Sequence, residues 1–300
     1  MWPAWQRARP PREALAWTAD AVGPGSHVVR TRLLPGGGWL ASHAVDVVDD
    51  TGRLHRVVLR RWARPGWEED PEMTAAREAA VLEELARTGI PAPRPLAVDP
   101  DGARAGVPAL VTTFLEGRPP TIPAVRKPAV LRQLAEMLVA IHSLDGGLRA
   151  VAAPFKPYYQ LERLGPPADS RRQDLWLAAI DAVSGLPPTG IETFLHRDYH
   201  PWNTLWMRGR LTGVVDWTGA SWGPPATDLA HLRSNLATEH DPDLADAARD
   251  AFLAAGGVAP DAAYWDVRTF LDWGPDLGEH RSGEGLARIE LYLERLMRRL

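Results

Sequence analysis

The pattern of apolar residues in this 300-residue chain changes near residue 116. Before that point, short runs of β-type residues occur at His27–Leu34, Ala44–Val48 and Leu54–Arg61. After it, apolar residues recur mostly with helical spacing, as in Ala129–Leu144. The sequence therefore predicts an α+β fold in which a small strand-rich part precedes a larger, mainly helical part.

Turn and helix signals refine this division. Within the strand-rich part, a helix is expected over residues 71–88, and Pro108–Leu115 has the composition of a buried strand. The turn at Glu116–Pro120 separates a predicted N-terminal lobe, residues 1–115, from a C-terminal lobe, residues 116–300. The C-terminal lobe is expected to contain helices at Arg171–Val183, 240–257 and 284–300, and short strands at Thr204–Met207 and Leu211–Val215.

Composition narrows the class of protein. Hydrophobic residues make up 45% of the chain and charged residues 24%, which is ordinary for a globular protein. Neither a membrane-spanning run nor a secretory leader is apparent, and there is no cysteine. The net charge of −4 does not favour nucleic acid. We therefore expect a cytoplasmic protein that binds neither membrane nor nucleic acid, and the sequence leaves its oligomeric state open.

One segment carries a recognisable chemistry. It reads His-Arg-Asp-Tyr-His-Pro-Trp-Asn over residues 196–203, and an apolar strand ending in Asp216 follows. Phosphoryl transfer needs a group that orients the attacking hydroxyl and oxygen ligands for Mg²⁺. Asp198 would orient the substrate hydroxyl or accept its proton, while Asn203 and Asp216 would bind the metal. The chain has only two asparagines, so this spacing should arise by chance on the order of once per hundred such chains.

The segment resembles the catalytic loop of the aminoglycoside phosphotransferase and choline kinase family, His-Gly-Asp-x-His-x-x-Asn followed by Ile-Asp-Trp. The resemblance implies a two-lobed protein-kinase-like fold, a transfer of phosphate from ATP with Mg²⁺, and a catalytic loop containing His196, Asp198 and His200. Arg197 stands where the family has glycine. The segment Pro225–Ala230 is similar to the family's Pro-x-x-Asp-Leu-Ala, whose aspartate, Asp228 here, is expected to brace the loop.

The resemblance is weaker toward the N-terminus. It implies a glycine-bearing hairpin over the phosphates, which would be Gly36, Gly37 and Gly38. It also implies a strand cation paired with a helical glutamate. No lysine precedes Lys127, so Arg60 is the expected cation, with Glu78 as its partner. Arg61 takes this role if the strand register differs by one residue.

The adenine ring is implied to bond to the backbone after the last strand of the N-terminal lobe. The residues there are Phe114, Leu115 and Glu116. Contacts of this kind would admit GTP as well as ATP. The role of residues 1–24 is left open.

Three other interpretations have some support. Gly219–Gly223 matches the Gly-x-Ser-x-Gly elbow of α/β-hydrolases, although two prolines follow it. Gly36-x-Gly38-x-x-Ala41 resembles a dinucleotide fingerprint, but a strand rather than a helix is expected to follow. His196-x-Asp198-x-His200 could bind a transition metal. A catalytically silent nucleotide-binding protein is a fourth interpretation, which the retention of Asp198, Asn203 and Asp216 opposes.

The acceptor is the least constrained part of the function. We expect a small molecule with a hydroxyl group, for example an antibiotic such as an aminoglycoside or a macrolide. A metabolic acceptor, such as an amino alcohol, a sugar or a hydroxyacyl thioester, is the alternative. Carboxylates near the C-terminus would suit a polycation, although a solvated surface explains them equally well. They are Asp261, Asp266, Asp272, Asp276, Glu279 and Glu284.

Overall fold

The computed structural model describes residues 3–34, 40–66, 72–272 and 284–300. The chain divides into two compact units, each built from three stretches of sequence. Unit 1 comprises Met1–Pro119, Ala150–Ala152 and Trp202–Ala220, and unit 2 comprises Pro120–Arg149, Ala153–Pro201 and Ser221–Leu300.

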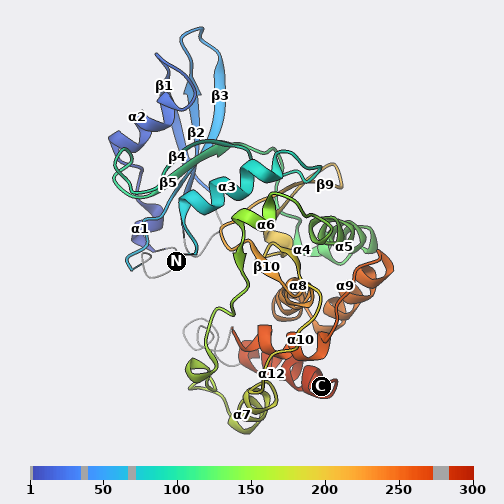
Figure 1. The fold of residues 1–300 in the computed structure, drawn as a ribbon. Helices are drawn as coiled ribbons and strands as arrows, with labels where there is room; N and C mark the ends of the chain where they lie inside the picture. The colour runs from blue at the N-terminus through green and yellow to red at the C-terminus, as the bar shows by residue number, and fades with distance from the viewer. Residues whose placement is uncertain (1–2, 35–39, 67–71, 273–283) are drawn as a thin grey trace. The chain divides into compact units, whose positions relative to one another are not determined.

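Unit 1 is built on a five-stranded antiparallel sheet in the order β1-β2-β3-β5-β4. Its elements are α1 (Ala4–Arg7), α2 (Arg12–Asp20), β1 (His27–Leu33), β2 (Ala41–Val48), β3 (Leu54–Arg61), α3 (Ala75–Leu85), β4 (Pro95–Asp99), β5 (Ala109–Thr113) and the hairpin β8 (Thr204–Met207) and β9 (Arg210–Val214). Figure 1 shows α2 beside β1, and α3 running along β4 and β5.

The two faces of this sheet have different partners. Ala14 and Trp17 of α2 join a buried apolar cluster with Val45, Val57 and Leu59. Side chains alternate along a strand, so the residue after Leu59, which is Arg60, points to the opposite face. The face toward α2 is therefore the apolar core, and the other face is available for charged groups. Residues 12–20, within the stretch of open role, supply part of this core.

The hairpin β8–β9 packs with unit 1 although it lies far along the chain. The Trp206 amide donates to the Arg118 carbonyl at 2.9 Å, and the Arg118 amide donates back at 3.2 Å. The Val214 amide donates to the Pro91 carbonyl at 2.8 Å. Residues 202–220 therefore belong to the same compact unit as residues 3–119, whereas the predicted division placed them in the C-terminal lobe. The functional roles assigned to residues 1–115 and 116–300 stay predictions.

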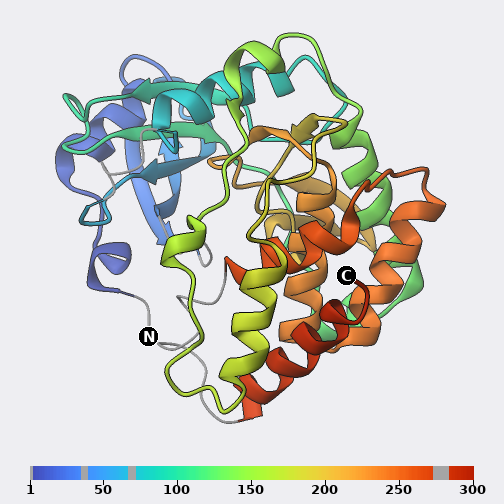
Figure 2. The same ribbon diagram turned by 60° about the horizontal axis from the view of Figure 1, so that its bottom comes forward.

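Unit 2 is mainly helical. It contains α4 (Ile122–Val125), α5 (Pro128–His142), β6 (Ala153–Pro154), η2 (Leu161–Arg163), α7 (Gln173–Ala182), β7 (Thr193–Leu195), β10 (Ser221–Gly223), α8 (Ala226–Glu239), α9 (Pro242–Ala254), α10 (Ala262–Leu271) and α12 (Glu284–Met297). Along the chain, α6 (Leu148–Val151) and η3 (Pro201–Asn203) lead from one unit into the other. Figure 2 shows the orange-to-red helices α8, α9, α10 and α12 gathered together, and α8 packs against the other three.

Helix α8 is the centre of unit 2. Apolar, polar and charged side chains alike are buried along it, including Asp228 and Arg233. Arg233 forms an ion pair with Asp266, and it donates to Asp246 at 3.2 Å. Across the part of the chain that the structure describes, every helix is too short or too polar to span a lipid bilayer.

Candidate active site

The backbone of the predicted catalytic loop is held by a single carboxylate in unit 2. Asp228 lies in the first turn of α8. Its Oδ2 accepts the His196 amide at 2.8 Å, and its Oδ1 accepts the Arg197 amide at 2.7 Å. Burial raises the pKa of Asp228, but the hydrogen bond and charge of His142, followed by the charge and the amide hydrogen bond of His196, outweigh burial and lower this pKa. The bracing role predicted for Asp228 is confirmed.

Arg197 adopts a conformation that glycine would adopt without strain. Its φ is 75°, in the left-handed region that costs other residues roughly 1–2 kcal/mol. Its guanidinium lies 4.5 Å from the ring centres of both Phe155 and Tyr158. These cation–π contacts, and the hydrogen bond that the Arg197 backbone N–H donates to Asp228, offset the backbone cost. The replacement of the family's glycine by Arg197 therefore keeps the turn and adds an aromatic anchor.

Asp198 is the candidate base, and two imidazoles converge on one of its oxygens. His231 Nε2 lies 2.9 Å from Asp198 Oδ1, and His200 Nε2 lies 3.4 Å from the same atom. Burial raises the pKa of Asp198, but His200 and His231 outweigh it and hold the pKa well below its usual range. The lowered pKa keeps this carboxylate ionised at neutral pH, and its 38% exposed fraction makes it reachable from solvent. We call Asp198, His200 and His231 the Asp–His–His cluster.

His196 acts through the backbone of the same loop. Its Nδ1 accepts the Asp198 amide at 3.2 Å, so this nitrogen carries no proton. The ring is fully buried and lies edge-on to Tyr199, whose hydroxyl donates to the Leu134 carbonyl of α5 at 2.9 Å. His196 therefore fixes the position of Asp198 without being exposed to a substrate.

His231 is a site residue that the sequence analysis did not identify, because its place depends on helix α8, which was not predicted either. It follows Asp228 by three residues on α8, and residues at that spacing lie on the same face of a helix. The helix that braces the loop through Asp228 therefore also presents an imidazole to Asp198. The transition-metal interpretation had considered only His196, Asp198 and His200, and the structure replaces His196 by His231 in that group.

In unit 1, the two predicted metal ligands, Asn203 and Asp216, lie at the same end of the hairpin β8–β9. Thr204 of β8 pairs with Val214 of β9, and the Val215 amide donates to the Asn203 carbonyl at 2.9 Å. Asp216 is the next residue, with a left-handed φ of 67°. Asn203 therefore lies opposite Val215 at one end of the hairpin, one residue before Asp216.

Asp216 joins a charged cluster on the polar face of the unit 1 sheet. Arg60 Nη2 lies 2.7 Å from Asp216 Oδ1 and 3.2 Å from Glu78 Oε1. The Thr218 hydroxyl lies 3.0 Å from Glu78 Oε2 and 3.1 Å from Asp216 Oδ1, and it accepts from Arg60 at 2.8 Å. The structure thus brings together the predicted Arg60, Glu78 and Asp216. Thr218, which carries no motif, was missed.

The neighbouring arginine has a different environment. Arg61 points to the other face of β3 and donates to the Ala8 carbonyl at 3.2 Å. Burial lowers the pKa of Arg60, whereas Glu78 and then Asp216 raise it, and the net shift is upward. Arg60 is therefore permanently charged and faces two carboxylates, while Arg61 faces neither of them.

The donor set at the end of the hairpin fits a hard divalent cation. An amide oxygen from Asn203 and a carboxylate from Asp216 are ligands of the kind that Mg²⁺ takes from proteins, with phosphate and water completing its shell. One guanidinium stands against two carboxylates in the cluster, so the local charge favours a cation beside Asp216.

The remaining predicted nucleotide contacts differ in what the structure describes. Phe114, Leu115 and Glu116 follow directly after β5. Arg56 lies 5.3 Å from the Phe114 ring centre and 3.7 Å from the Glu116 carboxylate. Gly36, Gly37 and Gly38 lie outside the described residues, and so does the Gly36-x-Gly38 fingerprint.

The hydrolase interpretation is wrong. Ser221 lies within β10, paired with Leu195 of β7 and Ala153 of β6, and it is 2% exposed. A nucleophile elbow instead presents its serine on an exposed turn between a strand and a helix.

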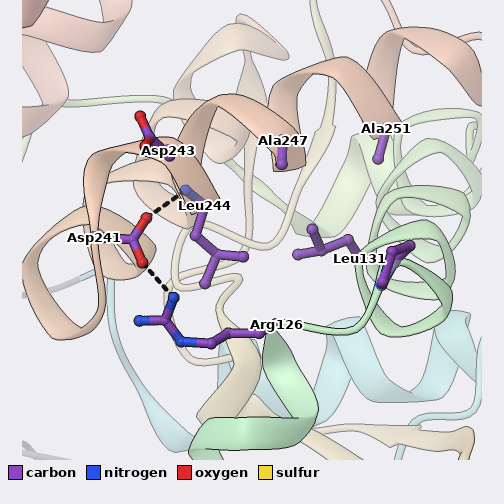
Figure 3. Close-up of a pocket in the computed structure, with 8 residues that line it drawn as sticks. Arg126, Leu131, Asp241, Asp243, Leu244, Ala247 and Ala251 are labelled. Atoms are coloured by element: carbon purple, nitrogen blue, oxygen red, sulfur yellow. Dashed lines mark hydrogen bonds and ion pairs between the residues drawn. The ribbon is translucent and has the colours of Figure 1, made fainter.

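A groove of about 360 Å³ lies between α5 and α9 of unit 2, apart from these residues. Figure 3 shows Leu131, Leu244, Ala247 and Ala251 along it, with an Arg126–Asp241 ion pair of 2.6 Å at one end. It contains none of the predicted site residues.

Comparison with known proteins extends these observations. The sequence matches the model of the phosphotransferase enzyme family (APH) over residues 32–270. No curated protein sequence gives a match. The fold is similar to a Ralstonia eutropha JMP134 protein provisionally named an aminoglycoside phosphotransferase, with 18% identity, a TM-score of 0.64, and coverage of 97% of this chain and 99% of that one.

Two further solved structures contain nucleotides. One is a thermostable mutant of the aminoglycoside phosphotransferase APH(4)-Ia with ADP and hygromycin B, at 17% identity and a TM-score of 0.63, covering 91% of this chain and 94% of that one. The other is the amicoumacin kinase hAmiN with AMP-PNP, Ca²⁺ and its antibiotic, at 14% identity and a TM-score of 0.60, covering 90% and 88%. The predicted kinase-like α+β fold is confirmed.

Proposed function

Because the chain belongs to the phosphotransferase enzyme family, we propose that it is an ATP-dependent kinase that phosphorylates a hydroxyl group of a small molecule. The observation that carries the proposal is the ionised carboxylate of Asp198, whose Oδ1 contacts His231 and whose two preceding residues, His196 and Arg197, donate their amides to Asp228. ATP is a cytoplasmic metabolite, so the proposed reaction belongs to the cytoplasm.

In the proposed reaction, the acceptor oxygen attacks the γ-phosphorus, and the bond to the β,γ-bridging oxygen breaks to release ADP. The hydroxyl proton passes to Asp198. The transition state of phosphoryl transfer is loose, so the proton need only move late, and a carboxylate of low pKa can serve mainly by orienting the hydroxyl. His200 and His231 hold that carboxylate in place.

The charged cluster of unit 1 is proposed to serve the nucleotide. Arg60 would bind phosphate oxygens, as a guanidinium can do with two parallel hydrogen bonds, and Glu78 would fix its orientation. Asn203 and Asp216 would hold Mg²⁺, which when bound neutralises charge on the phosphate oxygens. Nucleotides in the APH(4)-Ia and hAmiN complexes, and Ca²⁺ in the latter, support this assignment.

The acceptor is proposed to be an antibiotic, since the named relatives bind hygromycin B and amicoumacin. Two of the six carboxylates expected to attract a polycation, Asp266 and Asp272, have partners within the protein, while Asp276 and Glu279 lie outside the described residues. Asp266 forms a buried ion pair with Arg233, and Asp272 is paired with Arg268 at 2.6 Å and accepts the Tyr158 and Tyr159 amides. These contacts favour an acceptor with few positive charges, such as a macrolide, or a metabolic alcohol.

The decisive measurement is nucleotide consumption with Mg²⁺ and ATP or GTP against aminoglycosides, macrolides, nucleoside antibiotics, sugars and amino alcohols, with the product mass confirmed. Asp198→Ala should abolish turnover and retain Mg²⁺–ATP binding measured by calorimetry. The matched control is Asp250→Ala, which removes a carboxylate that is 66% exposed on α9 and should behave as wild type. A protein that fails to bind Mg²⁺–ATP would overturn the proposal. Binding without turnover across the panel would instead favour the silent nucleotide-binding protein.

A further inference from the structure

The three donor atoms of the Asp–His–His cluster lie close to the spacing of metal ligands. Asp198 Oδ1 is 2.9 Å from His231 Nε2 and 3.4 Å from His200 Nε2, and all three atoms lie within 4.8 Å of one another. Zinc bonds to imidazole and carboxylate are about 2.0–2.2 Å long, which places neighbouring ligands of a tetrahedral ion about 3.3–3.6 Å apart. A dication could therefore take these atoms as ligands after small side-chain movements.

The chemistry of the donors separates this cluster from the proposed magnesium ligands. Two imidazole nitrogens and one carboxylate oxygen suit zinc and its transition-metal neighbours, whereas Mg²⁺ takes oxygen ligands. Asn203 and Asp216 offer only oxygens of that harder kind. The two sets would therefore select different metals from the same solution.

The cluster is held rigidly and is open on one side. His231 lies on α8 one turn after Asp228, and Asp228 fixes the loop that carries Asp198 and His200. The imidazole rings are 5.9 Å apart at an angle of 47°, so they are not stacked against each other. Both histidines are largely buried, while the exposed side of Asp198 leaves room for access and for a water as fourth ligand. Within the described residues, no other group of three histidine, aspartate or glutamate side chains converges in this way.

We propose that Asp198, His200 and His231 form a transition-metal site that binds Zn²⁺ and, when filled, blocks the candidate base. The binding of metal stands independently of the proposed kinase function. Its consequence rests on that function: a dication bonded to Asp198 Oδ1 draws negative charge from the carboxylate that would orient and receive the hydroxyl proton. Zinc should then inhibit in competition with the acceptor rather than with ATP.

The test is a metal titration of tag-free protein without nucleotide. Co²⁺ binding is followed by its visible d–d absorption, and Zn²⁺ by its displacement of Co²⁺ and by calorimetry. We expect one ion per chain. Loss of an outer-shell partner alone weakens metal affinity by about 10–100-fold, so His231→Ala and His200→Ala should each weaken it by at least about 100-fold.

Two control variants define the position of the ion. His27→Ala removes an exposed imidazole from β1, and Asp216→Asn alters the proposed magnesium ligands. Both should bind Co²⁺ as wild type does, and thermal unfolding verifies that each variant is folded. The two histidine variants are independent, so failure of one to fold leaves the other to decide.

The outcomes of this titration are separable from those of the kinase assay, because no turnover is measured. The site is overturned if wild-type protein shows no saturable Co²⁺ or Zn²⁺ binding at micromolar concentrations. It is equally overturned if binding survives in both histidine variants, or if only Asp216→Asn abolishes it.

Discussion

A single oxygen atom, Asp198 Oδ1, accepts contacts from two imidazoles that come from different parts of the sequence. His200 is two residues away in the same loop, and His231 comes from α8. Two donors on one carboxylate oxygen restrict its rotation and reduce its affinity for a proton. The residue is therefore better suited to aligning a hydroxyl than to removing its proton early.

Replacing His231 tests whether this imidazole positions the Asp198 carboxylate. His231→Ala should lower kcat by about 10–100-fold, because Asp198 loses a fixed partner, while the Kd for ATP stays unchanged. Loss of the imidazole should also raise the pKa of Asp198, so the acid limb of the pH–rate profile should move to higher pH. His231→Gln can still donate a hydrogen bond and should recover part of the rate. An unchanged kcat and pH profile in His231→Ala would contradict a positioning role.

Replacing the bracing carboxylate should affect stability as well as rate. Asp228→Asn keeps one carbonyl oxygen but turns an NH₂ group toward one of the two backbone amides that Asp228 accepts. A buried amide left without an acceptor costs about 1–3 kcal/mol, and the free energy of unfolding in urea should fall by about that amount. Asp250→Asn on the exposed face of α9 should leave it unchanged. Equal stability of the two variants would show that the amide contacts contribute little.

Some residues of the candidate site could be predicted from the sequence, and others could not. Asp198, Asn203 and Asp216 were identified because their types and spacing match one chemistry. His231 and Thr218 were not, because each acts through a contact with a residue far away in the chain and neither belongs to a motif. Their roles follow from where α8 and the segment after β9 pack, which the local sequence does not specify.

Three elements of unit 1 meet at Arg60. The strand β3 carries Arg60, the helix α3 carries Glu78, and the segment after β9 carries Asp216 and Thr218. Glu78 is almost fully buried, so its carboxylate depends on these partners for compensation. Arg60 therefore links β3, α3 and the segment after β9, and in the proposed function it also binds the phosphates of the nucleotide.

A double variant separates these two roles. Arg60→Met removes the cation from buried Glu78 and should lower the free energy of unfolding by about 3–5 kcal/mol. Arg60→Met with Glu78→Met removes both charges and should regain most of that stability. Nucleotide binding should stay weak in both, because the phosphate ligand is absent from each. If the single variant has the same free energy of unfolding as wild type, the Arg60–Glu78 pair does not stabilise unit 1. If the double variant binds ATP normally, Arg60 is not the phosphate ligand.

At the level of elements, prediction succeeded where the pattern was locally strong. β3 and β8 have the predicted bounds, and α3 and α5 differ from their predictions by a few residues at the ends. β4 was missed because it begins at a proline, which an edge strand paired only with β5 tolerates. α8 was missed because it is buried nearly all round, and such a helix shows no amphipathic period.

The whole molecule should respond to pH through a histidine in the sheet of unit 1. His43 on β2 is 3% exposed, and its Nδ1 has no hydrogen-bond partner among the described residues. Burial, with the charge of Arg61 second, lowers its pKa from 6.5 to about 4. The folded state thus binds its proton less readily than the unfolded state. The stability contributed by neutral His43 is complete above pH 6.5 and is lost as the pH falls toward 4.

The measurement is urea unfolding at pH 8 and pH 5. Wild type should lose roughly 1–2 kcal/mol more stability between these values than His43→Gln, which has no proton to gain there. His27→Gln, at an exposed position, should lose as much as wild type. An identical pH dependence in wild type and His43→Gln would exclude His43 as the source.

Residues that contact each other in the folded unit 1 are synthesised at different times, because they lie far apart in the sequence. Glu78 is made early, but Thr218, which contacts it, follows 140 residues later. At ribosomal rates of 5–20 residues per second, roughly 7–28 s separate the two. During that interval the sheet can assemble while Glu78 and Arg60 lack two of their partners. During this period the incomplete unit 1 of each new chain is exposed to chaperones and proteases. Mutations at Arg60 or Glu78 should therefore lower the yield of folded protein before they lower the stability of the folded protein.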